Sequence, residues 1–144
     1  MTGTVERILK NLEDQRGCYA RLMEHMDIQL QAIADNDDEV LMQTIKDKSA
    51  LIQKLNQLEK EARSEVEALS PADREQFRRR GEPLRAAIIQ ALEKLISREE
   101  ACQEALIKKR AEVEAQILEF KKKKNLFEGY GGPPAKGGGF TGNA

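Results

Sequence analysis

Three side chains of this 144-residue sequence are candidates for nucleophilic, acid–base or metal chemistry: the single histidine, His25, and the two cysteines, Cys18 and Cys102. One histidine without cysteines at ligand spacing cannot form a zinc site. A helical di-metal centre needs a Glu-x-x-His motif on each of two helices. The glycines cluster near the C-terminus, where no helix follows them, so they form no phosphate-binding loop. We therefore predict that the protein is not an enzyme and has no catalytic, metal or cofactor site.

The balance of charges argues against a dedicated nucleic-acid binder. The chain has 24 basic and 25 acidic residues and a net charge of −1, whereas such binders carry a basic excess. Two basic runs, Arg78 to Arg80 and Lys121 to Lys124, are typical of solvated helix ends, where cations interact favourably with the helix dipole. A nucleic-acid binder that uses these two runs is one alternative.

The sequence also indicates a compartment. No apolar run approaches the roughly 20 residues that span a bilayer, and the N-terminal residues MTGTVERILKNLEDQ lack the apolar stretch of a signal peptide. We therefore expect a cytoplasmic protein without membrane insertion. In that reducing compartment, Cys18 and Cys102 are most simply small buried residues.

The spacing of apolar residues predicts an all-α fold. The composition, with 40% hydrophobic and 4% aromatic residues and no tryptophan, is typical of slender helical packing. Apolar residues recur at steps of three and four over residues 4–34 and 40–69, which predicts two helices. Thr2 or Thr4 can cap the first helix, and Asn36 with Glu39 resembles a capping box for the second. The short linker favours an antiparallel hairpin whose helices are each about 45 Å long.

Two residues inside these helices depart from the pattern. Gly17 costs about 1 kcal/mol relative to alanine in a helix interior, and we expect it to let a neighbouring helix approach closely. Lys48 lies on the apolar stripe of the second helix. We expect its aliphatic stem to be packed and its ammonium group to be in water.

A third helix starts at residues 70–73, SPAD, where Ser70 is the cap and proline takes the first helical position. We predict that this helix is short, because Gly81 and Pro83 either break or sharply kink it. A fourth helix then runs from about residue 83 to 127. At about 65 Å it is longer than the hairpin, so its C-terminal part is expected to extend past the bundle with an apolar face that has no internal partner.

The predicted architecture is an elongated antiparallel helical bundle that resembles a coiled coil. Its first, second and last helices are long, its third helix is short, and a disordered glycine-rich tail follows. Seven of the last sixteen residues are glycine, which is typical of a flexible segment. We therefore divide the chain into a helical domain, residues 1–128, and a flexible Gly/Pro-rich tail, residues 129–144.

Aromatic residues gather where the last helix meets the tail. Phe127, Tyr130 and Phe140 lie at the edge of the glycine-rich stretch or inside it. With Leu126 and the later half of the fourth helix, they form the first candidate binding surface. An aromatic residue in a mobile segment suits weak, reversible docking. The alternative is that Phe120, Leu126 and Phe127 cap the core and that Tyr130 is incidental.

A stretch that runs from the end of the first predicted helix through most of the second carries a resemblance to a known family. Residues 32–63, AIADNDDEVLMQTIKDKSALIQKLNQLEKEAR, resemble the FlgN-type flagellar export chaperones, which serve hook-filament junction proteins. In that family a long helix ends in a short acidic turn, and a second helix carries leucine and lysine at this spacing, here Leu41, Lys48, Leu51, Ile52 and Leu55. The resemblance covers roughly residues 4–132 and ends in an aromatic–glycine element, here residues 129–132, GYGG.

The resemblance implies a small cytosolic chaperone that is not driven by ATP. Such chaperones bind the junction proteins FlgK and FlgL, mask the amphipathic C-terminal helices through which these clients would assemble prematurely, and deliver them to the export gate protein FlhA. Contact with FlhA then falls on Tyr130. Client binding falls on the later apolar face of the last helix, and the predicted partner-binding residues are Leu106, Val113, Ile117, Phe120, Phe127 and Tyr130.

Two further interpretations stay open. FliT-type chaperones, which serve the filament cap protein, are also small antiparallel helical proteins. A self-associating structural coiled coil is the other alternative, although Glu99 and Lys109 interrupt the apolar stripe and no strict heptad is sustained. We expect a monomer or a weak homodimer.

Overall fold

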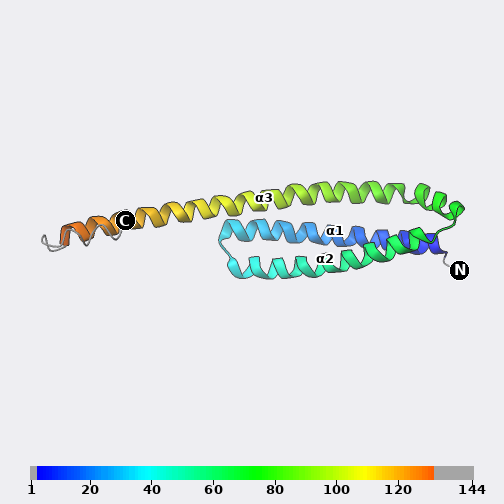
Figure 1. Cartoon of the computed structure of the whole chain (residues 1–144), viewed down its shortest axis with the longest axis horizontal. Helices are drawn as coiled ribbons and strands as arrows, with labels where there is room; N and C mark the ends of the chain where they lie inside the picture. Colours follow the sequence, from blue (N-terminus) through cyan, green and yellow to red (C-terminus); the bar gives the residue numbers. More distant parts are fainter. Residues whose placement is uncertain (1–2, 132–144) are drawn as a thin grey trace. The chain divides into compact units, whose positions relative to one another are not determined.

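The computed structural model describes residues 3–131 of the chain. Over these residues the chain forms three α-helices and no strands: α1 (Thr4–Asp35), α2 (Asp38–Glu67) and α3 (Pro71–Gly131) (Figure 1). The chain divides into two compact units, Met1–Ala105 and Leu106–Ala144, and α3 contributes residues to both. The predicted all-α class is confirmed.

The turn between α1 and α2 is built one residue later than the sequence predicts. Asn36 has a φ of 56° and a ψ of 36°, a left-handed conformation that ends helices, and the Asp37 N–H donates to the Ala32 carbonyl at 2.9 Å. Asp37 is the N-cap of α2, since its carboxylate accepts a hydrogen bond from the Val40 N–H at 3.1 Å. The predicted capping box of Asn36 and Glu39 is wrong, because Asn36 belongs to the end of α1.

The other two helix starts differ in how well the sequence predicts them. Ser70 caps α3 as predicted, because its hydroxyl oxygen accepts from the Asp73 N–H at 3.2 Å. At α1 the N-cap is Gly3, and no side chain caps the helix there. The predicted Thr4 cap is therefore wrong, since Thr4 is already the first helical residue, and Thr2 lies outside the described residues.

The predicted short third helix and separate fourth helix are wrong, because α3 is a single helix of 61 residues with Pro83 inside it. An interior proline costs about 3 kcal/mol or more, since it removes a hydrogen bond and crowds the preceding turn. Here Ile88, Ala91 and Leu95 follow the proline and pack against the core, and this burial keeps the segment helical. Figure 1 shows α3 bent near its start, in the bright green part of the ribbon, in line with the predicted kink.

Two clusters of buried side chains hold the first unit together. Toward the start of α1, the first cluster consists of Val5, Ile8, Ala62 and Leu69. The second joins the middle of α1 to α2 through Cys18, Tyr19, Leu22, Leu51 and Leu55. In Figure 1, α1 lies between α2 and the part of α3 that belongs to this unit. Both cysteines are free and buried, which confirms that prediction.

Among the described helices, no neighbour approaches Gly17 closely, in contrast to the prediction. It is exposed, and a Cβ built on it would meet nothing within 4 Å. The expectation of a close helix approach at this residue is wrong. At this level of α1, the next two residues, Cys18 and Tyr19, belong to the core.

The last turn of α3 overlaps the predicted tail. The helix continues through Gly129 and Tyr130 to Gly131, so the aromatic residue of the expected docking element is helical. The remainder of the predicted tail, including Phe140, lies outside the described residues. The division of the chain at residue 128 and the extension of the last helix past the hairpin stay predictions.

Candidate partner-binding surfaces

All six predicted partner-binding residues lie in the second unit and are exposed. Their exposed fractions run from 44% at Leu106 to 77% at Tyr130, and Phe120 and Phe127 reach 65% and 71%. Leu126 is also half exposed, at 53%. Within the second unit taken by itself, Phe120, Leu126 and Phe127 are thus not buried, and the alternative in which they cap the core stays open. Several large apolar side chains that are exposed to water within one short segment are typical of an interaction surface.

Five of these residues share one face of α3. At about 100° per residue, they fall within an arc of about 80°, and four of them are spaced by seven residues. We refer to this set as the C-terminal stripe: Leu106, Val113, Ile117, Phe120 and Phe127. It spans 22 residues, or about 32 Å of helix. The structure therefore brings together most of the predicted set on one continuous face.

Tyr130 is separate from the C-terminal stripe. It follows Phe127 by three residues, which displaces it by about 60° around the helix from the nearest stripe residue. Its side chain is 77% exposed.

Sequence reasoning missed a second apolar line on the same helix. Ile107 and Leu118 are 62% and 55% exposed, and eleven residues separate them, which returns to nearly the same side of a helix. This line lies about 100° from the C-terminal stripe. The eleven-residue spacing was the available signal. Because the two lines face different directions, Leu118 provides a natural control for residues of the stripe.

The second unit is more basic than the whole chain. Residues 106–131 contain seven lysine and arginine residues and four glutamates, a net charge of +3, whereas the full chain has −1. Two pairs form along the helix at a spacing of four: Arg110 with Glu114 at 3.1 Å and Lys124 with Glu128 at 3.5 Å. An apolar stripe within a basic segment favours a partner with acidic flanks.

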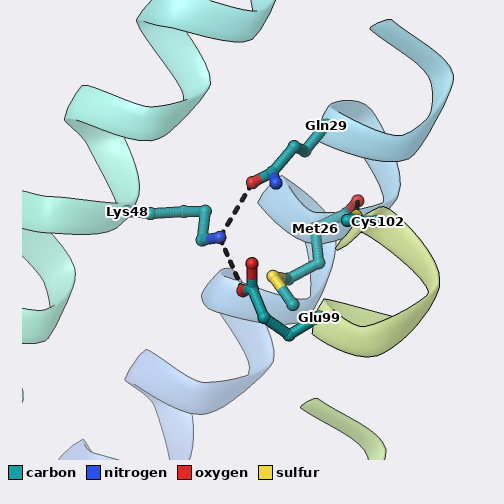
Figure 2. A network of polar contacts seen from close by, with 5 residues as sticks. All are labelled: Met26, Gln29, Lys48, Glu99 and Cys102. Atoms are coloured by element: carbon teal, nitrogen blue, oxygen red, sulfur yellow. Dashed lines mark hydrogen bonds and ion pairs between the residues drawn. The ribbon is translucent and has the colours of Figure 1, made fainter. Parts of the chain in front are cut away.

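In the first unit, Lys48 of α2 lies at the centre of a polar cluster that joins all three helices (Figure 2). Its Nζ donates to Gln29 Oε1 of α1 at 2.8 Å and to Glu99 Oε2 of α3 at 2.9 Å. The Lys48 side chain is only 12% exposed. The expectation that its ammonium group lies in water is wrong, because two residues that each interrupted an apolar stripe, Lys48 and Glu99, pair with each other.

Cys102 lies beside this cluster (Figure 2). Its Sγ is 3.9 Å from the Met26 carbonyl oxygen, and the residue is 1% exposed. Burial, with a smaller contribution from Glu99, raises the pKa of the Cys102 thiol, which keeps it protonated and unreactive. Within residues 3–131, no three histidine, cysteine or carboxylate side chains are grouped as metal ligands would be.

Sequence reasoning also missed two hollows in the first unit. One has a volume of about 470 Å³ and is lined by α1, the end of α2 and the first turns of α3. The other, of about 330 Å³, is lined by the middle of all three helices. Both need residues from three helices, so no periodicity within a single helix identifies them.

The length and apolarity of the described helices bear on whether any of them could cross a membrane. None of the helices within residues 3–131 combines the length and the apolarity that crossing a bilayer requires.

Comparison with known proteins places the sequence in a family. The family described as FlgN protein matches the chain over residues 1–129, which includes α1, α2 and α3 up to Gly129. No curated protein and no solved structure matches the chain.

Proposed function

This chain belongs to the FlgN family of flagellar export chaperones, which are not enzymes, and we propose that it acts in the cytoplasm on hook-filament junction proteins of the FlgK and FlgL type. In this proposal the chaperone holds its client until export and then delivers it to the gate protein FlhA. The observation that carries the proposal is the C-terminal stripe, an exposed apolar face about 32 Å long on one helix.

The stripe is the client-binding surface. An amphipathic client helix that would otherwise assemble prematurely needs an apolar face to cover it. Val113, Ile117 and Phe120 lie near the middle of the stripe and are 52%, 47% and 65% exposed. Central apolar and aromatic residues carry most of the binding energy in interfaces of this kind. Binding here needs no cofactor and no chemical step.

Tyr130 is the contact for the export gate. Its ring is exposed and points about 60° away from Phe127 around the helix. A second protein can therefore reach it while a client helix lies on the stripe. This arrangement supports a division of labour in which one helix holds the client and presents a separate aromatic group to the gate.

The first experiment is co-purification of the tagged protein from its own host, with mass spectrometry of what is recovered. An axial protein of the junction type in about equimolar amount supports the proposal. Recovery of the filament cap protein instead would assign the chain the role of a FliT-type chaperone. The client affinity of the purified pair is then measured by isothermal titration calorimetry.

Matched variants locate the two contacts. Ile117→Asp lies on the stripe, and Leu118→Asp is its control, with similar exposure on another face of the helix. We expect Ile117→Asp to weaken client binding about tenfold or more and Leu118→Asp to change it little. Tyr130→Ala should leave client affinity nearly intact and weaken FlhA binding. If Tyr130→Ala abolished client binding, the division of labour would be wrong.

Self-association is a second candidate, because Leu106, Val113, Phe120 and Phe127 are spaced by seven residues. A stable coiled coil also needs apolar residues three positions further on in each heptad. Those positions here are Lys109, Gln116 and Lys123, which weakens a homodimer along the stripe. Sedimentation velocity at several concentrations tests this alternative, and a stable dimer abolished by Ile117→Asp would establish it.

A further inference from the structure

The two hollows of the first unit lie along one line. Both have α1 as a floor, and the α1 residues that line them are Leu12, Gln15, Tyr19, Leu22 and Met26. These residues follow one another at steps of three and four, so they share one face of the helix. We refer to the combined feature as the α1 groove. Its floor spans 15 residues, or about 21 Å.

The walls of the α1 groove continue in the same way. On α2 the lining residues step from Lys48 through Ile52 and Glu59 to Val66, and on α3 they step from Arg74 to Glu99. Each series keeps one helix face toward the groove. Three helices thus surround a trough that is open on its fourth side, where a four-helix bundle would place another helix.

The lining of the α1 groove is largely apolar and partly in water. Ile52 of α2 is 44% exposed, and Ile89 and Ile96 of α3 are 45% and 58% exposed. Leu92, between them, is 38% exposed. Apolar side chains on both walls therefore face an open space that is long enough for about four turns of helix.

The two ends of the α1 groove differ in charge. Arg74, Arg78 and Arg85 line one end. Arg78 and Arg85 contact Glu75 and Glu82 on their own helix, but neither glutamate lines the hollow, whose described lining residues include three arginines and no carboxylate.

The opposite end of the groove has no such excess of positive charge. Lys48, Glu59 and Glu99 line it. Lys48 is paired with Glu99 at 2.9 Å, and Glu59 accepts a hydrogen bond from the Tyr19 hydroxyl at 3.3 Å.

We infer that the α1 groove is a second binding site, which takes an amphipathic α-helix of a partner protein whose acidic residues lie at one end. The apolar face of that helix covers Ile52, Leu92 and Ile96. Its acidic end lies over Arg74, Arg78 and Arg85, because opposite charges there set the direction and register of the bound helix. The site is separate from the C-terminal stripe and does not depend on the client proposed for it.

The test uses the full chain and a fluorescently labelled 18-residue helical peptide. The peptide carries leucine at helical spacing on one face and glutamates at one end. A control peptide has the same sequence with lysine in place of those glutamates. Fluorescence anisotropy should show binding of the glutamate peptide at least about tenfold tighter than that of the lysine peptide. Equal binding of the two peptides overturns the inference.

Two variants of α3 locate the site. Ile96→Glu places a charge in the groove, and Ile107→Glu is the matched control in the second unit, with a similar exposed fraction. We expect at least a tenfold loss of peptide affinity for Ile96→Glu and less than about twofold for Ile107→Glu. Ile52→Glu on the opposite wall repeats the test if Ile96→Glu lowers helicity. Equal losses for the groove and control variants overturn the inference.

A charge exchange tests the direction of the bound helix. The double variant Arg74→Glu/Arg78→Glu should reverse the preference, so that the lysine peptide binds more tightly than the glutamate peptide. An unchanged preference contradicts the proposed orientation.

A second copy of the chain is the other possible occupant of the groove. Sedimentation velocity of the full chain tests it, because a dimer that dissociates in Ile96→Glu would show that a second copy fills the groove. Peptide binding that persists in Ile117→Asp shows that the α1 groove and the C-terminal stripe are independent.

Discussion

The pair of Lys48 and Glu99 should contribute measurably to stability, although most ion pairs on helical proteins do not. The perturbation is a double-mutant cycle of Lys48→Met, Glu99→Ala and the two together. Methionine keeps the length of the lysine stem and removes its charge, and alanine is compatible with the helix. The cycle isolates the interaction between the two side chains from the effect of each substitution alone.

The expected magnitude follows from the geometry. The Nζ–Oε2 distance is 2.9 Å, the Lys48 side chain is 12% exposed and the Glu99 side chain is 56% exposed. Exposed pairs contribute about 0.2–1 kcal/mol, whereas hydrogen bonds to charged groups away from water contribute about 1.5–3 kcal/mol. One buried and one half-exposed partner place this pair between these ranges. We expect a coupling free energy of about 1–2 kcal/mol.

The two single variants should each lose stability, but for different physical reasons. Glu99→Ala leaves the ammonium group of Lys48 with one acceptor, Gln29 Oε1, in a largely buried position. Lys48→Met removes the donor that reaches this amide oxygen, and Gln29 is only 4% exposed. An unpaired buried acceptor costs about 1–3 kcal/mol. Each single variant should therefore be destabilised, and the double variant by less than the sum of the two.

Urea unfolding measured by far-UV circular dichroism provides the four free energies. Thiol labelling of Cys102, which is 1% exposed beside the cluster, reports opening of the first unit alone. The control cycle uses Lys10 and Asp14, also 2.9 Å apart but with both side chains well exposed on one helix. Its coupling should be close to zero. A Lys48–Glu99 coupling no larger than that of the control would refute the reasoning from burial.

Two further predictions concern α1. Gly17→Ala should raise the free energy of unfolding by about 0.5–1 kcal/mol, because Gly17 is an exposed helix residue and an added Cβ meets no atom within 4 Å. Urea unfolding measures this change, and a loss of stability would contradict the open surroundings of Gly17. Burial, and next the charge of Glu59, raise the pKa of the Tyr19 hydroxyl above its ordinary value of 10.0, so the folded state retains this proton to higher pH and stability falls as pH rises above about 10. The stability advantage over Tyr19→Phe, measured by thermal unfolding from pH 8 to 11, should narrow over that range, and a constant difference would contradict it.

Local signals in the sequence predicted much of the secondary structure. Ser70 followed by proline marks the start of α3, and the apolar spacing places α1 and α2 within a few residues of their observed ends. The cap of α2 was misplaced by one residue, because both Asn36 and Asp37 are good capping residues. The left-handed backbone at Asn36, which decides between them, is a property of the folded turn.

Part of the candidate site was also predictable. Spacing on one helix predicts four members of the C-terminal stripe, Leu106, Val113, Ile117 and Phe120, and Phe127 stands out as an aromatic residue next to the tail. Ile107 and Leu118 lie outside the spacing of three and four residues that marks the stripe, so that spacing does not identify them. The α1 groove was not predictable in this way, since each of its walls comes from a different helix.

The sequence by itself determined the all-α class, the hairpin of the first two helices, the C-terminal stripe and the resemblance to the FlgN family. All of these depend on residues that are close together in the chain. Tertiary structure alone decided that α3 continues through Pro83, where packing of the following residues outweighs the cost of a proline. It also decided that Lys48 is paired with Glu99. These features depend on contacts between residues far apart in the sequence, whose free energy exceeds that of the local preferences.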